Sequence, residues 1–363
     1  MPSLHAPALQ ALGLSPRWEA LFAPHARDGV VLARVVRGDR GSALIAFERG
    51  IARAKPATRL LKQAGGAADL PAVGDWVAAL AREDLDVPLI EAVLERASAI
   101  TRGDAGRGSD LQVLAANVDT VFVVHPIADG PNLRRLEREL SLAWVSGAVP
   151  VVVLTKADLA ADPAGARIAV EAAAPGADVL LVNALAGDGV EPLFGYLAPN
   201  RTAVLIGPSG AGKSTLINAL LGEERQATRS VSVHDGRGRH TTVARELVQV
   251  PRGGVLIDTP GLRAVGLTGS EEGIASAFPE IDEAAASCRY RDCTHRDEPG
   301  CAVAAAVAAG TLPAERLASY HKLRREAQVV AAKTDARARA EEERKWKIIH
   351  KAAREFYKRG GRG

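Results

Sequence analysis

A glycine-rich run, Gly207-Pro-Ser-Gly-Ala-Gly-Lys-Ser214, has the residue types and spacing needed to wrap around phosphate groups. It matches G-x-x-x-x-G-K-[ST], in which backbone N–H groups point at phosphate oxygens, the lysine bridges the β- and γ-phosphates, and the last hydroxyl ligates magnesium. An apolar run, Ala203 to Ile206, leads in, and Thr215 to Leu221 has a helical pattern, as this mechanism requires. The expected phosphate-binding residues are Gly207, Pro208, Ser209, Gly210, Ala211, Gly212, Lys213, Ser214 and Thr215, with Ser214 on magnesium.

The segment Asp258-Thr-Pro-Gly261 is expected to supply the other half of the phosphate site. It follows the apolar run Val255 to Ile257 and stands 44 residues after Ser214. A carboxylate at Asp258 can reach magnesium through water, and the N–H group of Gly261 can sense the γ-phosphate.

A third segment, Thr155-Lys-Ala-Asp158, resembles the N-K-x-D motif that selects guanine. A carboxylate at Asp158 can accept hydrogen bonds from the ring N–H and the exocyclic amine of guanine, which adenine does not offer in that arrangement. The stem of Lys156 can lie along the base, with Thr155 in place of the usual Asn and Ala157 between them. A second apolar run, Val179 to Val182, ends at Asn183-Ala184, where a loop contacting guanine O6 is expected.

The order of these motifs is permuted relative to ordinary GTPases, because Asp158 precedes Gly207. The rearrangement corresponds to a cut after the Asp258 strand and a join across about Tyr196 to Arg201, a connection short enough for neighbouring termini. The segment after Gly261 then runs directly into the C-terminal domain. We expect loss of the γ-phosphate to act on that domain.

The segment Arg225 to Val243 is expected to be the first switch. It contains two hydroxyls that could ligate magnesium, Thr241 and Thr242, beside a flexible basic stretch. Leu262 stands where Ras-like enzymes carry a water-orienting Gln. His240 could position the attacking water instead, or it could be a surface histidine, and the sequence leaves both interpretations open. The expected catalytic residues are His240, Lys213, Thr241 and Thr242.

All three cysteines of the chain fall within Cys288-x4-Cys293-x-His295-x5-Cys301. Three thiolates and an imidazole form a closed tetrahedral donor set suited to structural zinc. With four ligands no position stays open for catalysis, which also argues against a metal-delivery role. Reduced thiols buried in a helical domain are the competing interpretation. An odd number of cysteines argues against a disulfide framework.

Three kinds of sequence pattern predict the elements that position these motifs. Short β-rich runs between Gly29 and Arg102 predict a small barrel of the oligonucleotide-binding type, although an SH3-like barrel fits that spacing nearly as well. Apolar runs separated by helix-length segments then predict a mainly parallel sheet, and the Ala-rich remainder predicts helices. The expected domains are an extension (1–28), a barrel (29–104), a permuted GTPase domain (105–268), a helical zinc domain (269–343) and a basic tail (344–363).

Charge is distributed unevenly along the 363 residues. The last 20 residues hold eight Lys or Arg against one acid, Glu355, whereas the whole chain carries +3, so the other 343 residues carry about −4. Such a tail indicates a polyanionic partner or a solvated helix end. No apolar run reaches about 18 residues and no secretion signal is recognisable, so a soluble cytoplasmic protein without a membrane partner is expected.

The combined motifs resemble the family of ribosome small-subunit-dependent GTPases, circularly permuted GTPases of bacterial ribosome assembly. The resemblance extends from about Gly29 to the C-terminus and also rests on Val73-Gly-Asp-Trp-Val77 and Gly238-Arg-His-Thr-Thr242. It implies an oligonucleotide-binding barrel, a zinc domain, and binding of GTP and GDP with magnesium. It also implies binding to the small ribosomal subunit and its rRNA, which stimulates a slow GTPase. A monomer is expected.

Two other functions remain open from the sequence. One is an RNA-binding assembly factor whose nucleotide site is occupied but weakly hydrolytic. The other is a metallochaperone NTPase, which would need an exposed and exchangeable metal site. Turnover measurements with ribosomal subunits distinguish the assembly factor from a GTPase. A closed Cys3His set argues against the metallochaperone, because it leaves no position open for exchange.

Overall fold

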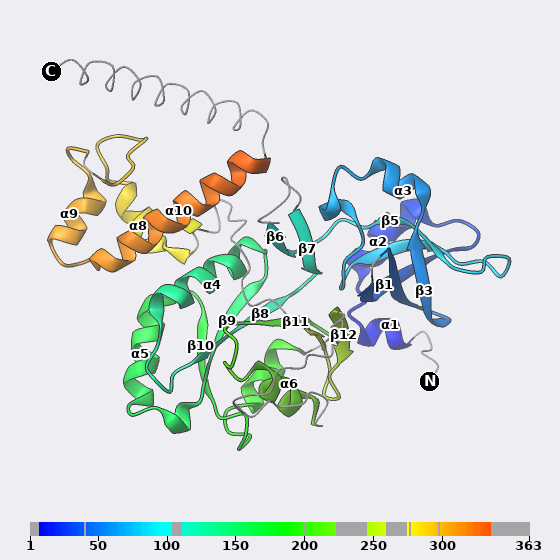
Figure 1. Ribbon diagram of the computed structural model, residues 1–363, viewed down its shortest axis with the longest axis horizontal. Helices are drawn as coiled ribbons and strands as arrows, with labels where there is room; N and C mark the ends of the chain where they lie inside the picture. Colours follow the sequence, from blue (N-terminus) through cyan, green and yellow to red (C-terminus); the bar gives the residue numbers. More distant parts are fainter. Residues whose placement is uncertain are drawn as a thin grey trace, which may run out of the picture.

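The computed structural model places a barrel, a parallel sheet and a helical domain side by side (Figure 1). The described residues are 7–39, 41–103, 111–198, 200–222, 245–258, 274–275, 277–296 and 298–334.

The first domain is a closed five-stranded barrel. Its strands are β1 (Val30–Asp39), β2 (Ser42–Phe47), β3 (Gly50–Pro56), β4 (Trp76–Leu80) and β5 (Leu89–Val93). Strand β1 pairs with both β2 and β4, and β3 lies parallel to β5, which closes the order β1-β2-β3-β5-β4. Helix α3 (Thr58–Gln63) and the 3-10 turn η2 (Ala67–Asp69) link β3 to β4. This Greek-key closure confirms the oligonucleotide-binding type over the SH3-like alternative.

The N-terminal extension packs against the barrel. It contains α1 (Pro7–Ala11), α2 (Pro16–Phe22) and η1 (Ala23–His25). Gly13, at φ +90°, separates the first two helices. The Trp18 ring stacks on Trp76 of β4 with 5.8 Å between centroids. The extension therefore covers an aromatic side chain that is completely buried.

The second domain is built on six strands in the order β10-β9-β8-β11-β13-β12. They are β8 (Thr120–Pro126), β9 (Val149–Thr155), β10 (Asp178–Val182), β11 (Thr202–Ile206), β12 (Arg245–Gln249) and β13 (Val255–Asp258). All neighbours are parallel except β12, which runs antiparallel to β13. The mainly parallel sheet predicted from the apolar runs is confirmed.

Both faces of this sheet are covered, which explains why its strands are apolar throughout. Helices α4 (Leu133–Val145) and α5 (Pro163–Ala173) cover one face, and α6 (Lys213–Leu221) with the 3-10 segment η4 (Glu191–Tyr196) covers the other. Along β8, Val121 and Val123 belong to the core on the α4 side, whereas Phe122 and Val124 belong to the core on the α6 side. The alternation follows from the two-residue period of a strand.

The barrel and the sheet are joined edge to edge. Strand β1 pairs antiparallel with β12, with Arg37 opposite Glu246 and Gly38 opposite Arg245, so that eleven strands form one continuous sheet. The buried guanidinium of Arg34 strengthens the junction, because it donates hydrogen bonds to the carbonyls of Leu12 and Gly74 and to Thr202 Oγ1. Burial lowers the pKa of Arg34 to about 10, which leaves it charged at neutral pH.

A separate hairpin of β6 (Ala99–Gly103) and β7 (Leu111–Ala116) lies between the two domains in the chain. The expected boundary at residue 104 falls between these two strands. Their pairing makes the hairpin a unit of its own in the described part of the chain, and sequence analysis did not identify it.

Gly74 is expected to be intolerant of any side chain. Its φ is +93°, and a Cβ there would lie 2.1 Å from the Ala116 carbonyl oxygen. Gly41, at φ +70° with open space around it, provides a matched control. We expect Gly74→Ala to lower the free energy of unfolding by more than about 3 kcal/mol and Gly41→Ala by about 1 kcal/mol. Urea unfolding followed by tryptophan fluorescence measures both, and equal losses would contradict the close approach.

The third domain is helical. Its described helices are α8 (Pro279–Ala285), α9 (Ala302–Ala308) and α10 (Ala314–Thr334). Helix α10 begins one residue after Pro313 and runs along α4 of the second domain (Figure 1). None of the described helices combines the length and hydropathy that crossing a membrane requires. The tail at 344–363 lies outside the described residues.

Candidate nucleotide and metal sites

The carboxyl ends of the five parallel strands meet at one edge of the sheet. Because β8, β9, β10, β11 and β13 run in the same direction, the segments that follow them gather there. These segments include Thr155–Asp158, Asn183–Ala184, Gly207–Ser214 and the residue Asp258. Ligands of open parallel sheets bind at this edge. Motifs far apart and permuted in the sequence are thus assembled into one region.

The loop between β11 and α6 has the conformation that its glycines allow. Gly207, Gly210 and Gly212 have φ values of +142°, +77° and +91°. At Gly207 a Cβ would lie 2.2 Å from the carbonyl oxygen of Val124, so the loop must pass directly over the end of β8. Gly212 then caps α6 at its N-terminus. The resulting curl ends at a helix N-terminus, which attracts anions.

Lys213 reaches back across this loop. Its Nζ atom donates hydrogen bonds to the carbonyls of Gly207 at 2.8 Å and Pro208 at 2.6 Å. Ser214 and Thr215 follow in the first turn of α6, and both are half-buried. The ammonium therefore lies over the concave side of the glycine-rich loop, where phosphate oxygens can meet it.

The hydroxyl of Thr155 connects the base-selecting segment to the phosphate loop. Thr155 ends β9 and donates a 2.6 Å hydrogen bond to the Ala211 carbonyl, across 56 positions of sequence. Lys156 follows with φ +58°, and Asp158 is exposed in the short 3-10 turn η3 (Ala157–Leu159). A threonine in place of the usual asparagine thus keeps a direct bond to the loop. The sequence alone did not identify Ala211 as the partner of this hydroxyl.

Asn183 shapes the next loop along this edge. Its Oδ1 atom accepts hydrogen bonds from the N–H groups of Leu185 and Ala186, and its own N–H group bonds to Asp188. Val182 pairs with Thr155 in the register of β10 and β9, so the Asn183–Ala184 loop adjoins the base-selecting segment. Backbone groups of this loop can contact the same ligand as Asp158.

Asp258 closes β13 at the same edge, opposite Glu246 of β12. The other residues expected around the γ-phosphate, Gly261, His240, Thr241 and Thr242, lie outside the described residues.

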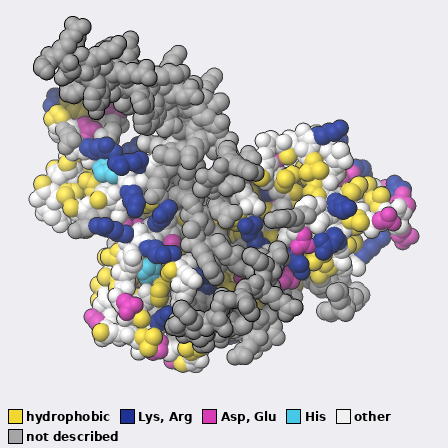
Figure 2. Space-filling view, viewed as in Figure 1, with side chains coloured by type: hydrophobic (Ala, Val, Ile, Leu, Met, Phe, Trp, Pro, Cys, Tyr) yellow, Lys and Arg dark blue, Asp and Glu magenta, His cyan; other side chains and the backbone are white. Residues whose placement is uncertain are grey.

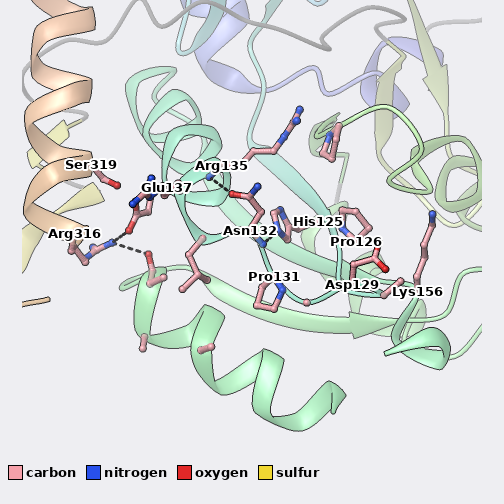
Figure 3. Close-up of a pocket in the computed structure, with 18 of the residues that line it drawn as sticks. His125, Pro126, Asp129, Pro131, Asn132, Arg135, Glu137, Lys156, Arg316 and Ser319 are labelled. Carbon is pink, nitrogen blue, oxygen red and sulfur yellow. Dashed lines mark hydrogen bonds and ion pairs between the residues drawn. The ribbon is translucent and has the colours of Figure 1, made fainter. Parts of the chain in front are cut away.

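A cavity of about 1010 Å³ opens beside the phosphate loop (Figure 3). Pro208, Ser209 and Gly210 form one wall, and Lys156 lies at the same end. The opposite end is formed by α10 through Arg316 and Ser319. The cavity therefore extends from the nucleotide region to the helical domain.

Arg316 ties the helical domain to the second domain at this cavity. Its guanidinium forms ion pairs with Glu137 of α4, at 3.1 Å, and with Glu280 of α8, and it donates to the Ala173 and Ala277 carbonyls. Both Arg316 and Glu137 are almost completely buried. Removing either partner of such a pair leaves an unpaired buried charge, which is costly. No local motif marks Arg316 in the sequence.

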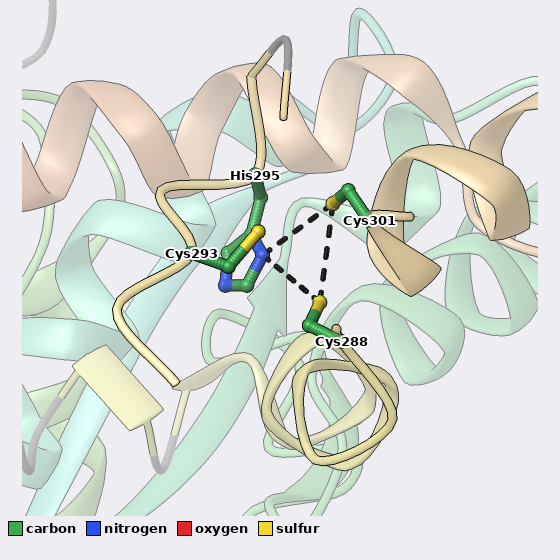
Figure 4. A group of neighbouring side chains, drawn as sticks. All are labelled: Cys288, Cys293, His295 and Cys301. Carbon is green, nitrogen blue, oxygen red and sulfur yellow. Dashed lines mark hydrogen bonds between the residues drawn. The ribbon is translucent and has the colours of Figure 1, made fainter. Parts of the chain in front are cut away.

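The three cysteines and His295 converge on one point (Figure 4). Cys288 Sγ lies 3.9 Å from Cys301 Sγ, and His295 Nδ1 lies 3.6 and 3.7 Å from these two sulfurs. All four donor atoms lie within 4.8 Å of one another. Metal–sulfur bonds of about 2.3 Å and metal–nitrogen bonds of about 2.0 Å at tetrahedral angles place two sulfurs about 3.8 Å apart and a sulfur and a nitrogen about 3.5 Å apart. The cluster has the donor set and dimensions of a metal site.

The electrostatics of the cluster differ from one donor to the next. Burial opposes ionisation of Cys288, but hydrogen bonds from the N–H groups of Val303 and Ala302 and from the neighbouring Cys293 and Cys301 together outweigh it and lower the pKa. Desolvation and the neighbouring sulfurs raise the pKa of Cys293 to about 11. Burial and nearby Arg324 lower the pKa of His295, which keeps the imidazole neutral. A dication removes the mutual repulsion of the thiolates.

The loop carrying these donors is held from outside the cluster. Glu298 accepts a hydrogen bond from the Thr294 hydroxyl and, at 2.9 Å each, from the N–H groups of Arg296 and Thr294, and these bonds lower its pKa to about 2. His321 Nε2 of α10 donates to the His295 carbonyl at 3.2 Å. Such outer contacts orient metal ligands.

Comparison with known proteins places these features in a recognised group. The model of the RsgA GTPase family matches residues 93–268. A small ribosomal subunit biogenesis GTPase RsgA from Streptomyces coelicolor is 47% identical over 98% of this chain and 96% of its own. The protein of the same name from Opitutus terrae is 45% identical over 95% of this chain and 97% of its own.

Two solved structures share the fold. The crystal structure of YjeQ from Thermotoga maritima matches with a TM-score of 0.62 and 25% identity, over 82% of this chain and 98% of that one. The structure of YloQ, described as a circularly permuted GTPase, matches with a TM-score of 0.60 and 23% identity, over 84% of this chain and 97% of that one. The permuted strand order is thus shared with solved structures.

Proposed function

The chain belongs to the RsgA family of GTPases, and on that premise we propose that it binds the small ribosomal subunit and hydrolyses GTP to GDP and phosphate during late subunit maturation. The proposal further holds that the subunit stimulates hydrolysis. The observation that carries it is the hydrogen bond from Thr155 to Ala211, because that bond unites the base-selecting and phosphate-binding segments in one site.

Guanine selection is assigned to the segment after β9. The Asp158 carboxylate would accept from the ring N–H and amine of guanine, while the Lys156 stem lies along the base and Ala157 sets the turn between them. The Asn183–Ala184 loop would contact O6 through backbone N–H groups. The exposed position of Asp158 beside the phosphate loop supports this assignment.

Phosphate and magnesium binding are assigned to the loop and its neighbours. The N–H groups of Gly207 to Thr215 would hold the phosphates, with Lys213 bridging the β- and γ-phosphates. Ser214 and Thr242 would ligate magnesium directly and Asp258 through water. When bound, magnesium neutralises charge that develops on the phosphate oxygens. Hydroxyl and carboxylate oxygens at one sheet edge are the donors that this ion prefers.

Zinc is the metal proposed for the Cys3His cluster. Thiolate and imidazole donors at tetrahedral distances favour zinc over magnesium or calcium, which prefer oxygen ligands. Because His295 and Cys301 are buried and the four donors leave no open position, the site suits a retained structural ion. The same closure argues against metal delivery.

RNA binding is assigned to the barrel and to the basic tail at 344–363. Phosphate contacts from such a tail would make subunit binding weaken steeply with salt. We also propose that the protein is a cytoplasmic monomer. The relatives are named as GTPases, which does not favour a non-hydrolytic assembly factor.

The decisive experiment is GTP turnover measured against purified small subunits, large subunits and tRNA. We expect small subunits alone to raise turnover, by at least about tenfold, which corresponds to about 1.4 kcal/mol of the barrier. In the same assay, His240→Ala should abolish this stimulation and leave the affinity for labelled GDP unchanged. Equal stimulation by small subunits, large subunits and tRNA would contradict the small subunit as the specific partner. Unchanged stimulated turnover in the His240→Ala protein would remove His240 from the mechanism.

A further inference from the structure

A second cavity, of about 570 Å³, lies in the helical domain beside the metal cluster. It opens between the metal-binding loop, α8 and α10, away from the nucleotide segments. Its lining includes Asp282, Tyr290, Arg291, Thr294, Tyr320 and Arg324. Pockets of this size take ligands as large as a nucleotide.

Tyr290 is the one aromatic residue among the exposed large apolar side chains of the described chain, with 42% of its surface accessible. It stands between two metal ligands, Cys288 and Cys293, and its carbonyl accepts a hydrogen bond from the Cys293 N–H group. A bound metal therefore fixes both ends of the short loop that carries the ring. An aromatic ring held in this way can stack on a planar partner with little further loss of conformational entropy.

One guanidinium lies over the ring, and two others line the cavity. The Arg289 guanidinium lies 5.6 Å from the Tyr290 ring centroid, and Arg291 and Arg324 line the cavity. Arg324 is itself oriented by α10, since it lies over the Tyr320 ring and donates to its hydroxyl at 3.4 Å. Lys and Arg side chains also gather where α10 meets α4 (Figure 2). These positive charges suit the phosphate groups of a nucleic-acid strand that enters the cavity.

Two carboxylates, Asp282 and Asp292, also line the cavity. The lining is therefore not a purely cationic surface that would bind any polyanion. It combines cations for phosphates, a ring for stacking and carboxylates that can accept hydrogen bonds from base amines. Bases in a duplex are already stacked and present no free face to such a ring, whereas an unpaired base does.

We propose that this cavity binds an unpaired nucleotide of RNA, with its base stacked on Tyr290 and its phosphates held by Arg291 and Arg324. The inference rests on the proposed function in taking RNA as the partner. It adds a contact that reads single-stranded structure, separate from the barrel and the tail. The metal would act in RNA binding by ordering the loop that carries the ring.

The test measures binding of the full-length zinc-loaded protein to a fluorescent single-stranded RNA oligonucleotide and to the same sequence as a duplex, over a series of salt concentrations. Tyr290→Ala should weaken binding to the single strand by about tenfold, as expected for one lost stacking contact, without changing the salt slope. Tyr290→Phe should bind like the parent protein. Arg291→Ala should lower the salt slope by about one.

Controls separate this pocket from other contacts. Ile168→Ala removes an apolar side chain of α5 that is also exposed and should change nothing. Deleting residues 344–363 should flatten the salt slope while preserving the loss caused by Tyr290→Ala. Metal content and thermal unfolding report whether each variant keeps its fold.

Three results would overturn the proposal. The first is unchanged single-strand binding by a folded Tyr290→Ala protein. The second is an equal loss of single-strand affinity in Tyr290→Phe and Tyr290→Ala. The third is a loss of duplex affinity in Tyr290→Ala as large as its loss of single-strand affinity. If small subunits fail to stimulate GTP turnover while Tyr290→Ala still weakens single-strand binding, the proposed function fails and the pocket assignment survives. If small subunits stimulate GTP turnover while Tyr290→Ala leaves single-strand binding unchanged, the proposed function stands and the pocket assignment fails.

Discussion

Replacing Asp158 by Asn is expected to weaken GTP binding by about a hundredfold, or about 3 kcal/mol, and to create a site for xanthosine triphosphate. The carboxylate accepts two hydrogen bonds from guanine, whereas an amide presents an N–H group to the guanine amine, where two donors would face each other. Xanthine carries a carbonyl oxygen in place of that amine, and the amide can donate to it.

The measurement is displacement of labelled GDP by GTP, xanthosine triphosphate and ATP. Asp162→Asn provides the same chemical change four residues away, at the N-cap of α5, where Asn serves as well as Asp. Because Asp158 is exposed, its replacement should leave the core unchanged. If Asp158→Asn weakens GTP and xanthosine triphosphate equally, the carboxylate does not read the base.

Loss of the metal is expected to unfold the region from 277 to 308 while the sheet domain stays folded. Structural zinc contributes on the order of 10 kcal/mol or more to folding of small domains. The large apolar side chains that are fully buried in this region, Phe278, Ile281 and Val303, contribute less, at about 1.5 to 3 kcal/mol each. Cys301→Ser should have the same effect, because Cys301 is both a buried donor and the residue whose sulfur caps α9.

Hydrogen exchange of the Cys301→Ser protein measures this directly. We expect lost protection in α8 and α9 and in the metal loop, with protection kept in β8 to β11. GDP affinity should persist, whereas stimulation by small subunits should fall. Ser287→Ala, which changes an exposed neighbour of Cys288, is the control. Full protection in a metal-free protein would show that the helices hold the region without an ion.

The sheet and its motifs were predictable from the sequence because their signals are local. Strands buried on both faces are continuous apolar runs, and the glycine-rich loop, Thr155–Asp158 and the Cys3His spacing each carry their chemistry within a few residues. Strand β3 carries a weaker signal, because its residues Gly50–Pro56 alternate between exposed and more buried positions and include two charged side chains without an apolar run.

Long-range contacts could not be predicted in this way. The bond from Thr155 to Ala211, the pairing of β1 with β12 and the ion pairs of Arg316 join residues far apart in the chain. Each uses residue types that are common on protein surfaces. Their roles follow from the folded arrangement, because no spacing rule connects the partners.

The pairing of β1 with β12 has a consequence for any attempt to dissect the molecule. Without the barrel, β12 would become the outermost strand and present a row of unsatisfied N–H and C=O groups to solvent. Exposed strands of this kind recruit other chains by strand addition, which leads to aggregation. The barrel thus also shields the neighbouring sheet from self-association, and truncation at the barrel would remove this protection together with the surface proposed to bind RNA.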